Sequence, residues 1–250
     1  MSSSSSQFYT IQQIDAVKGI ITPHYRDLKD LGTKYISTFQ NLKVEDLIPL
    51  SESLGIEIEN IGFGELWTIT KVYFPKIKIH VLLQFDDEGL STEPYELQFL
   101  FSGKQVHWLS GEDLCHLCEI LLNYTSTILK RQFPQDIYSE TPSPLLDKAM
   151  IERTINWENI SIDEELLSYF DFQPFPGLKI EYNIRSKPTS FTITSNKLDR
   201  FWIYDVDRLV IMGLNQLLRL VKIKLGKQAP PICNLMFSGY YKKSNPIQFQ

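Results

Sequence analysis

The most constraining feature of this chain is an amphipathic segment, HWLSGEDLCHLCEILLNYTSTILK, which spans residues 107–130. Ser110 and Asp113 form an approximate capping box, in which the serine hydroxyl accepts a hydrogen bond from the backbone N–H of Asp113. Apolar residues then recur at helical spacing on one face, at Leu114, Cys118, Leu121 and Ile128. The segment therefore predicts a helix that begins after Ser110 and buries one side.

Three segments ahead of this helix are predicted to be β-strands, at residues 65–74, 76–85 and 93–101. In the second of them, KIKIHVLLQF, apolar and polar side chains alternate, which is typical of a sheet with one covered face. Turn residues follow the second strand at 86–89 and the third at 102–104. These patterns predict antiparallel strands that pack against the long helix.

Residues 1–40 are predicted to form a helical N-terminal arm. Thr10 is expected to cap a short helix, and the apolar spacing of the next helix runs up to Gly32, with a turn or two beyond it. In the segment that follows, Pro49 is expected to divide residues 44–54 into two short helices, because proline breaks a helix interior. The sequence leaves open whether the arm covers the core or contacts a partner.

A second unit with a similar order of elements is predicted after a proline-containing linker at residues 133–160. It contains a helix capped by Ser161, two short strands, and a long helix capped by Asp205. The segment FLFSGKQVHWLSGEDL of the first unit aligns with TITSNKLDRFWIYDVDRL of the second. We interpret this likeness as a weak internal duplication, with two unrelated strand-turn-helix units as the alternative.

The predicted fold class is α+β, with two sequence-similar halves of antiparallel strands that are each covered by a long helix. The first half spans residues 41–132, and the second spans residues 161–250 and includes a C-terminal tail. One arrangement left open is a single continuous sheet made from both halves.

The composition is that of a folded globular protein, with 43% hydrophobic and 22% charged residues. A net charge of −5 argues against a phosphate backbone as the main partner, so nucleic acid is not expected. The first residues lack the basic and apolar regions of a signal peptide, and no apolar run reaches the roughly 20 residues of a membrane span. Because three cysteines leave at least one thiol unpaired, we expect a reducing compartment, the cytoplasm.

Cys115 and Cys118 are the one cysteine pair with the spacing of a metal or redox site. A structural zinc site needs four ligands, and His107, His80 or Cys233 would have to complete it through tertiary contacts. A redox cysteine is expected at a helix N-terminus, whereas Cys115 lies a full turn beyond the predicted cap. We therefore interpret both cysteines as core residues and expect no cofactor. A redox or metal protein that uses Cys115, Cys118 and His107 is an alternative.

The C-terminal tail, residues 228–250, is too rich in apolar and aromatic residues for a solvated tail. It either packs back on the sheet or presents a contact surface, and the candidate partner-binding residues are Phe237, Tyr240, Tyr241 and Trp202. The sequence carries no nucleophile elbow, Walker, dinucleotide or zinc-protease motif. We therefore expect a non-catalytic protein that binds another protein, as an adaptor, assembly factor or regulator.

The main alternative is a protein that binds a small molecule or a lipid-like ligand between the sheet and its helices. Its pocket would be lined by Trp67, Phe85, Phe99, Phe101 and Trp108. A retained ligand would identify this function, and a core packed without a cavity would exclude it.

Overall fold

The computed structural model describes residues 7–15, 22–86, 94–132, 163–164, 166–167, 171–183, 190–195 and 201–224. The chain divides into two compact units, residues 1–132 and 133–250. Both units mix helices with antiparallel strands, so the predicted α+β class is confirmed. None of the described helices combines the length and the apolar composition that crossing a bilayer requires.

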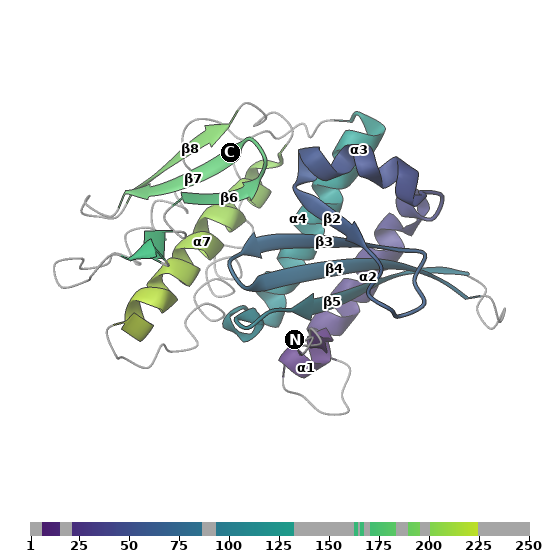
Figure 1. The fold of residues 1–250 in the computed structure, drawn as a ribbon, viewed down its shortest axis with the longest axis horizontal. Coiled ribbons are helices and arrows are strands. Elements are labelled where there is room, and N and C mark those ends of the chain that lie inside the picture. Colours follow the sequence, from purple (N-terminus) through teal and green to yellow (C-terminus); the bar gives the residue numbers. More distant parts are fainter. Residues whose placement is uncertain are drawn as a thin grey trace, which may run out of the picture. The chain divides into compact units, whose positions relative to one another are not determined.

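The first unit is built on a five-stranded antiparallel sheet (Figure 1). From edge to edge the strands are β1 (Phe8–Tyr9), β5 (Tyr95–Ser102), β4 (Ile77–Phe85), β3 (Trp67–Phe74) and β2 (Ile56–Glu59). The three central strands are the three that the sequence predicts at residues 65–74, 76–85 and 93–101. In β4, Ile77, Ile79 and Val81 are fully buried on one face. The same alternation places His80 on the opposite face.

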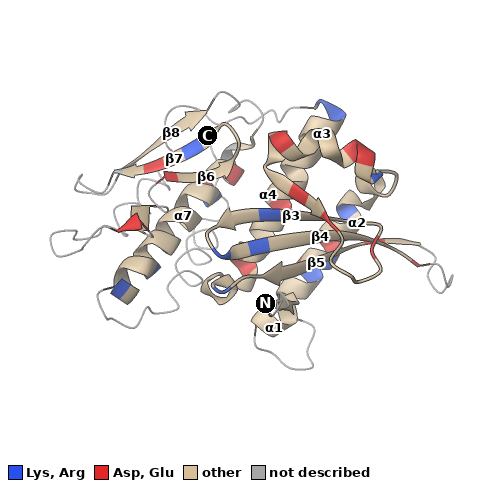
Figure 2. Ribbon diagram, in the orientation of Figure 1, with Lys and Arg blue, Asp and Glu red and all other residues tan. Residues whose placement is uncertain are grey.

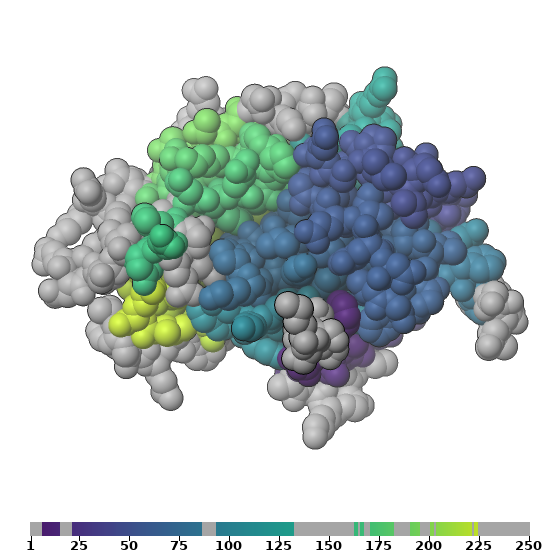
Figure 3. All heavy atoms as spheres, in the orientation of Figure 1, coloured from purple at the N-terminus to yellow at the C-terminus, as the bar shows by residue number. Residues whose placement is uncertain are grey.

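The helices of the first unit are α1 (Ile11–Ile14), α2 (Pro23–Phe39), α3 (Val44–Leu54) and α4 (Gly111–Lys130), and the short 3₁₀ helix η1 (Val106–Trp108) precedes α4. Of these, α2 and α4 pass behind the sheet in Figure 1. α2 contacts β5 and α4, and α4 contacts β4. The helices of the predicted N-terminal arm therefore cover the core of the first unit. In the space-filling view, the blue and teal atoms of the strands form much of the front surface of this unit (Figure 3).

The start of α4 follows the predicted capping box. The Ser110 hydroxyl accepts a hydrogen bond from Asp113 N at 2.9 Å, and Ser110 N donates to the Asp113 carboxylate at 3.3 Å. A tertiary contact explains why the first helical residue is a glycine, Gly111. A Cβ atom there would lie 2.2 Å from the Asp15 carboxylate and 2.4 Å from Nδ1 of His24. A glycine lets the N-terminal segment pack directly onto the beginning of α4.

α2 continues through Gly32 to Phe39, which agrees with the turn or two expected beyond this glycine, and a Cβ atom at Gly32 would lie 3.0 Å from the carbonyl oxygen of Leu97 on β5. The predicted interruption at Pro49 is wrong. α3 continues through Pro49, which leaves the carbonyl of Glu45 without its usual intrahelical donor. Both Pro49 and Glu45 are exposed, so water can hydrate that carbonyl and the helix is not broken.

The second unit contains a separate three-stranded antiparallel sheet, so the single continuous sheet is not formed by the described strands. The sheet consists of β6 (Asp171–Phe175), β7 (Leu178–Asn183) and β8 (Ser190–Ser195), and the long helix α7 (Ile203–Lys224) follows it. β6 was not predicted because it contains Pro174. The strand tolerates this proline because β6 is an edge strand whose register shifts between Phe172 and Phe175.

Ser161, the predicted cap of the first helix of the second unit, lies outside the described residues, and Leu166 N donates to the Asp163 carboxylate at 2.9 Å, as in an N-cap. The predicted cap of the long helix is corrected. α7 begins at Ile203, and Asp205 lies in its first turn rather than before it. This earlier start is possible because the Trp202 carbonyl accepts the backbone N–H of Asp205 at 3.0 Å.

Each unit presents three consecutive antiparallel strands followed by a long helix, β3–β5 with α4 and β6–β8 with α7. This shared order agrees with the aligned segments, while the duplication itself stays a prediction. The predicted linker and the C-terminal tail lie outside the described residues.

Candidate binding site at the end of the first sheet

The loop Asn60 to Leu66, between β2 and β3, is organised around one buried carboxylate. Glu65 accepts hydrogen bonds from the backbone N–H groups of Ile61 at 2.5 Å, Gly62 at 3.3 Å and Phe63 at 2.7 Å. The Thr68 hydroxyl donates to the same carboxylate at 3.1 Å. These bonds hold the loop in one conformation, as a carboxylate holds the first turn of a helix.

The charge state of Glu65 follows from these contacts. Burial by itself raises the pKa of this carboxyl, but the backbone hydrogen bonds and the Thr68 hydroxyl outweigh it, so the pKa lies below its ordinary value. Gly62 and Gly64 have φ angles of +88° and +76°, a region that favours glycine. The Gly-Phe-Gly sequence therefore forms a bend before β3.

The fixed loop presents large apolar side chains to solvent. Phe63 is 49% exposed and Leu66 is 52% exposed. At the neighbouring end of β4, Phe85 is 44% exposed and its ring centroid lies 5.0 Å from that of Tyr95. Single exposed apolar residues are common, but several at one end of a sheet mark a candidate contact surface.

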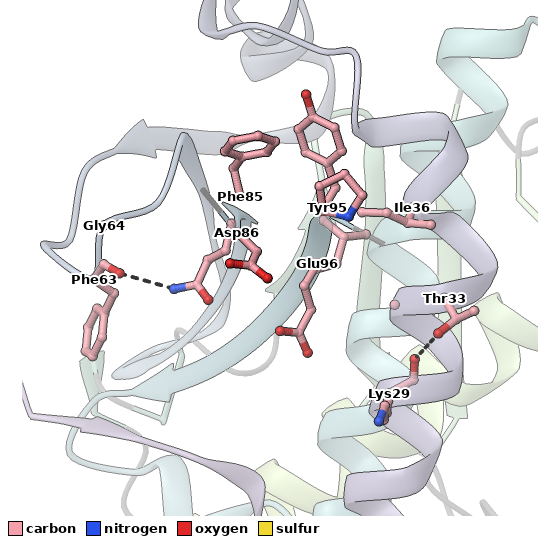
Figure 4. A pocket seen from close by; sticks show the side chains of 13 residues that line it. Lys29, Thr33, Ile36, Phe63, Gly64, Phe85, Asp86, Tyr95 and Glu96 are labelled. Atoms are coloured by element: carbon pink, nitrogen blue, oxygen red, sulfur yellow. Dashed lines mark hydrogen bonds between the residues drawn. The ribbon is translucent and has the colours of Figure 1, made fainter. Parts of the chain in front are cut away.

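Phe63, Phe85 and Tyr95 border a hollow of about 670 Å³ (Figure 4). Phe63 and Gly64 form one side, α2 forms the other side through Lys29, Thr33 and Ile36, and the ends of β4 and β5 lie between them. The amide of Gln84 donates to the carbonyl oxygen of Phe63 at 3.1 Å, which ties the loop to β4. The hollow therefore has walls from a helix, a hairpin end and a fixed loop.

The aromatic residues of the predicted ligand pocket are not brought together around one hollow. Trp67 and Phe101 are buried in the core, and Trp67 Nε1 donates to the Leu42 carbonyl at 2.9 Å. Trp108 is half-buried in η1. Phe99 lines a second hollow of about 200 Å³ between α1, α2 and β5, and Phe85 lines the larger one.

Cys115 and Cys118 are both buried, and burial raises the pKa of both thiols. The Cys115 thiol donates to the His24 carbonyl oxygen at 3.5 Å. His107 is exposed, and its ring centroid lies 4.8 Å from that of Tyr9. Within the described ranges, no three His, Cys, Asp or Glu side chains are grouped so that they could hold a metal ion.

Of the predicted partner-binding residues, Phe237, Tyr240 and Tyr241 lie outside the described residues. Trp202 is half-buried just before α7, and its ring centroid lies 4.3 Å from that of Tyr204. The loop around Glu65 and the hollow beside it were not predicted as a site. The signals that could have found them are the exposed Phe63 between two glycines and the acid that follows.

A buried polar chain across four strands was also missed. The Ser102 hydroxyl lies 2.8 Å from His80 Nε2, His80 Nδ1 lies 2.7 Å from the Thr70 hydroxyl oxygen, and that hydroxyl donates to Glu59. The order of groups is that of an activated serine. However, Ser102 is 3% and His80 2% exposed, and neither lines either hollow. We therefore interpret the chain as a structural network that pairs polar groups on the sheet.

A second buried polar contact ends α3. Lys71 on β3 is 3% exposed, and its Nζ atom donates to the carbonyl oxygens of Leu54 at 2.6 Å and Gly55 at 3.1 Å. Burial lowers its pKa to about 7. Lys71 and Lys78 are the blue positions on β3 and β4 in Figure 2, whereas α3 and β2 carry acidic residues. Lys71 thus satisfies backbone acceptors at a helix end and does not line the hollow of the candidate site.

Comparisons of the chain with protein-family models, with curated proteins and with solved structures found no match.

Proposed function

We propose that this chain is a non-catalytic protein-binding protein, an adaptor, assembly factor or regulator, and that it contacts its partner through the end of the first sheet. The contact surface we assign consists of Phe63, Leu66 and Phe85 with the hollow beside them. This extends the earlier expectation of protein binding to residues outside the tail.

The fixed loop is the observation that carries the proposal. Because Glu65 already holds the backbone of residues 61–63, a partner would not have to order this loop on binding, which removes part of the usual entropic cost. Aromatic side chains are enriched among the residues that contribute most to interfaces. Because Phe63 is 49% exposed, burial of the rest of its side chain would contribute roughly half of the 1.5–3 kcal/mol of full burial, about 1 kcal/mol.

The test is affinity capture from the native host with the full chain as bait. The double variant Phe63→Ser, Leu66→Ser is compared with Val72→Ser, which removes an apolar side chain of similar exposure (42%) at the other end of β3. We expect a stoichiometric partner that the wild type and Val72→Ser retain and the double variant loses. Thermal unfolding of all three chains serves as the folding control. Recovery of no stoichiometric partner with the wild type would contradict the proposal.

A small-molecule-binding function is the second candidate, and the volume of the hollow favours it. About 670 Å³ falls within the range of roughly 300–1,000 Å³ that is typical of ligand pockets. Native mass spectrometry of the purified protein tests this function directly. A retained small ligand would support it, and a bare mass would favour the protein-binding proposal.

We also propose the cytoplasm as the compartment in which the protein works. The support for this is the odd number of cysteines in the chain, which suits a reducing environment better than a disulfide framework.

A further inference from the structure

We infer that the free edge of β8 binds a second copy of this chain, and that two copies join by antiparallel pairing of β8 with β8. This edge lies in the second unit, so it is separate from the surface proposed for the partner protein. Three features of β8 support the pairing: its composition, its unpaired side and the two apolar side chains that it leaves half-buried.

β8 is an edge strand without the features that usually protect an edge. Its sequence, SFTITS, contains no charged residue and no proline, and it pairs with β7 without a register shift. The other edges of the two described sheets are protected. β6 carries Pro174 and a register shift, β2 carries Glu57 and Glu59, and β1 is only two residues long. Strand edges that lack charge, proline and bulges tend to pair with another strand.

One side of β8 has no strand beside it. Within the part of the chain that the structure describes, β7 is the one strand that pairs with β8 (Figure 1). Successive residues of a strand direct their N–H and C=O groups to alternate sides, so about half of the backbone groups of β8 face away from β7. Among the described residues, the backbone of residues 191–194 has no hydrogen-bond partner outside β7. A second strand would find a row of donors and acceptors there.

The face of this sheet that packs against α7 is incompletely covered at β8. Tyr182 on β7 is buried, and its hydroxyl donates to the carbonyl oxygen of Val210 on α7. The register places Phe191 opposite Tyr182, and Ile193 lies on the same face two residues further along β8. Both side chains are only half-buried, although Ile180 on β7 is fully buried. A further strand beside β8 would cover them.

A second β8 is well matched to this edge. In an antiparallel pair whose twofold axis passes through Thr192, Phe191 of each copy lies opposite Ile193 of the other, and Thr192 lies opposite itself. An aromatic ring then meets a β-branched side chain on the covered face, and hydroxyl groups meet on the open face, which are favourable cross-strand pairs. Roughly four to six backbone hydrogen bonds would form. Because so short a pair buries a small area, we expect a weak dimer, with a Kd on the order of tens of micromolar.

The test is sedimentation velocity of the full chain at concentrations below and above this Kd. Thr192→Lys places two like charges opposite each other across the twofold axis, so it should weaken dimerisation at least about tenfold. Within one copy, the new ammonium group lies beside Glu181 on β7, so we expect a normal fold, which thermal unfolding checks. Gln173→Lys adds the same charge at an exposed position on β6, and this matched control should dimerise like the wild type. An equal mixture of Thr192→Lys and Thr192→Glu should recover the dimer.

Hydrogen exchange of the wild type is a second measurement that needs no variant. The amides of β8 that face away from β7 should exchange more slowly as the protein concentration rises. A wild type that stays monomeric over this range, or a dimer that Thr192→Lys leaves unchanged, would overturn the inference. Protection of β8 that does not depend on concentration would overturn it as well, because another part of the same chain would then occupy the edge.

Discussion

The hydroxyl oxygen of Ser102 on β5 lies 2.8 Å from Nε2 of His80 on β4, and both side chains are buried on the face of the sheet opposite the helices. Because the Thr70 hydroxyl donates to Glu59, it accepts from Nδ1 of His80, which places the imidazole proton on Nδ1. Ser102 then donates to Nε2. The neutral imidazole is therefore the form that this network requires.

His80 should make the stability of the protein depend on pH below neutrality. Burial lowers its pKa to about 4, with Glu59 opposing the shift and Lys78 adding to it. Between the ordinary value of 6.5 and about 4, the unfolded chain binds more protons than the folded chain, so stability falls as pH falls. The slope from this group is at most about 1.4 kcal/mol per pH unit. The free energy of unfolding, measured with urea across this pH window, should change less with pH in His80→Gln than in the wild type. The control His107→Gln, at an exposed position, should keep the wild-type slope.

Lys71 should produce a second pH dependence, above neutrality. Burial lowers its pKa from 10.5 to about 7, so over this range the folded state binds fewer protons than the unfolded state. Stability should therefore rise as pH increases through this range. Lys71→Met should abolish most of this rise in stability. Lys78→Met is the matched control, because Lys78 is half-exposed, and it should keep the rise. An equal rise in wild type and Lys71→Met, measured by urea unfolding, would show that Lys71 has its ordinary pKa in the folded protein.

Glu65→Gln should destabilise the loop more than the protein as a whole. An amide has one acceptor oxygen where the carboxylate has two, so some of the backbone N–H groups of Ile61, Gly62 and Phe63 lose their acceptor. We expect a loss of about 1–3 kcal/mol in the free energy of unfolding and faster hydrogen exchange at these three amides. Glu52→Gln, an exposed acid on α3, should change neither measurement. Unchanged exchange in Glu65→Gln would mean that the glycine turns alone hold the loop.

Gly111→Ala should destabilise the protein although alanine is the better helix former. The added methyl group would meet the Asp15 carboxylate at 2.2 Å, and we expect a net loss of about 1–3 kcal/mol, measured by thermal or urea unfolding. The double variant Asp15→Ala, Gly111→Ala should lose less than the sum of the two single changes, because the clash is relieved. If the losses in the free energy of unfolding of the two single variants simply add, the Asp15 side chain does not contact Gly111, and the prediction is contradicted.

Local signals in the sequence were sufficient for much of the fold. The capping box at Ser110 and the alternation in β4 each depend on residues close together in the chain, and both predictions are confirmed. Pro49 and Pro174 were misread, because a proline is tolerated where the group that it leaves unpaired faces water or the edge of a sheet. That exposure depends on tertiary packing.

The candidate site was less predictable than the fold. The spacing of residues 60–65 suggests a turn, but it does not show that Glu65 folds inward while Phe63 faces outward. The neighbourhood of Phe63, Tyr95 and α2 depends on contacts between elements that are distant in sequence. The cysteine pair with the spacing of a metal or redox site, Cys115 and Cys118, is buried, and the Cys115 thiol donates to the carbonyl oxygen of His24.

The packing of Asp15 and His24 against Gly111 has a consequence for how this protein folds. Closing that contact encloses residues 15–111 of the first unit, which spans residues 1–132, in one loop of chain, so the entropy of closure opposes folding until α4 is in place. During synthesis, the N-terminal helices would emerge long before their docking partner. We therefore expect the first unit to be acquired late and as a whole, and a chain shortened at its beginning to lose α4 together with the helices removed.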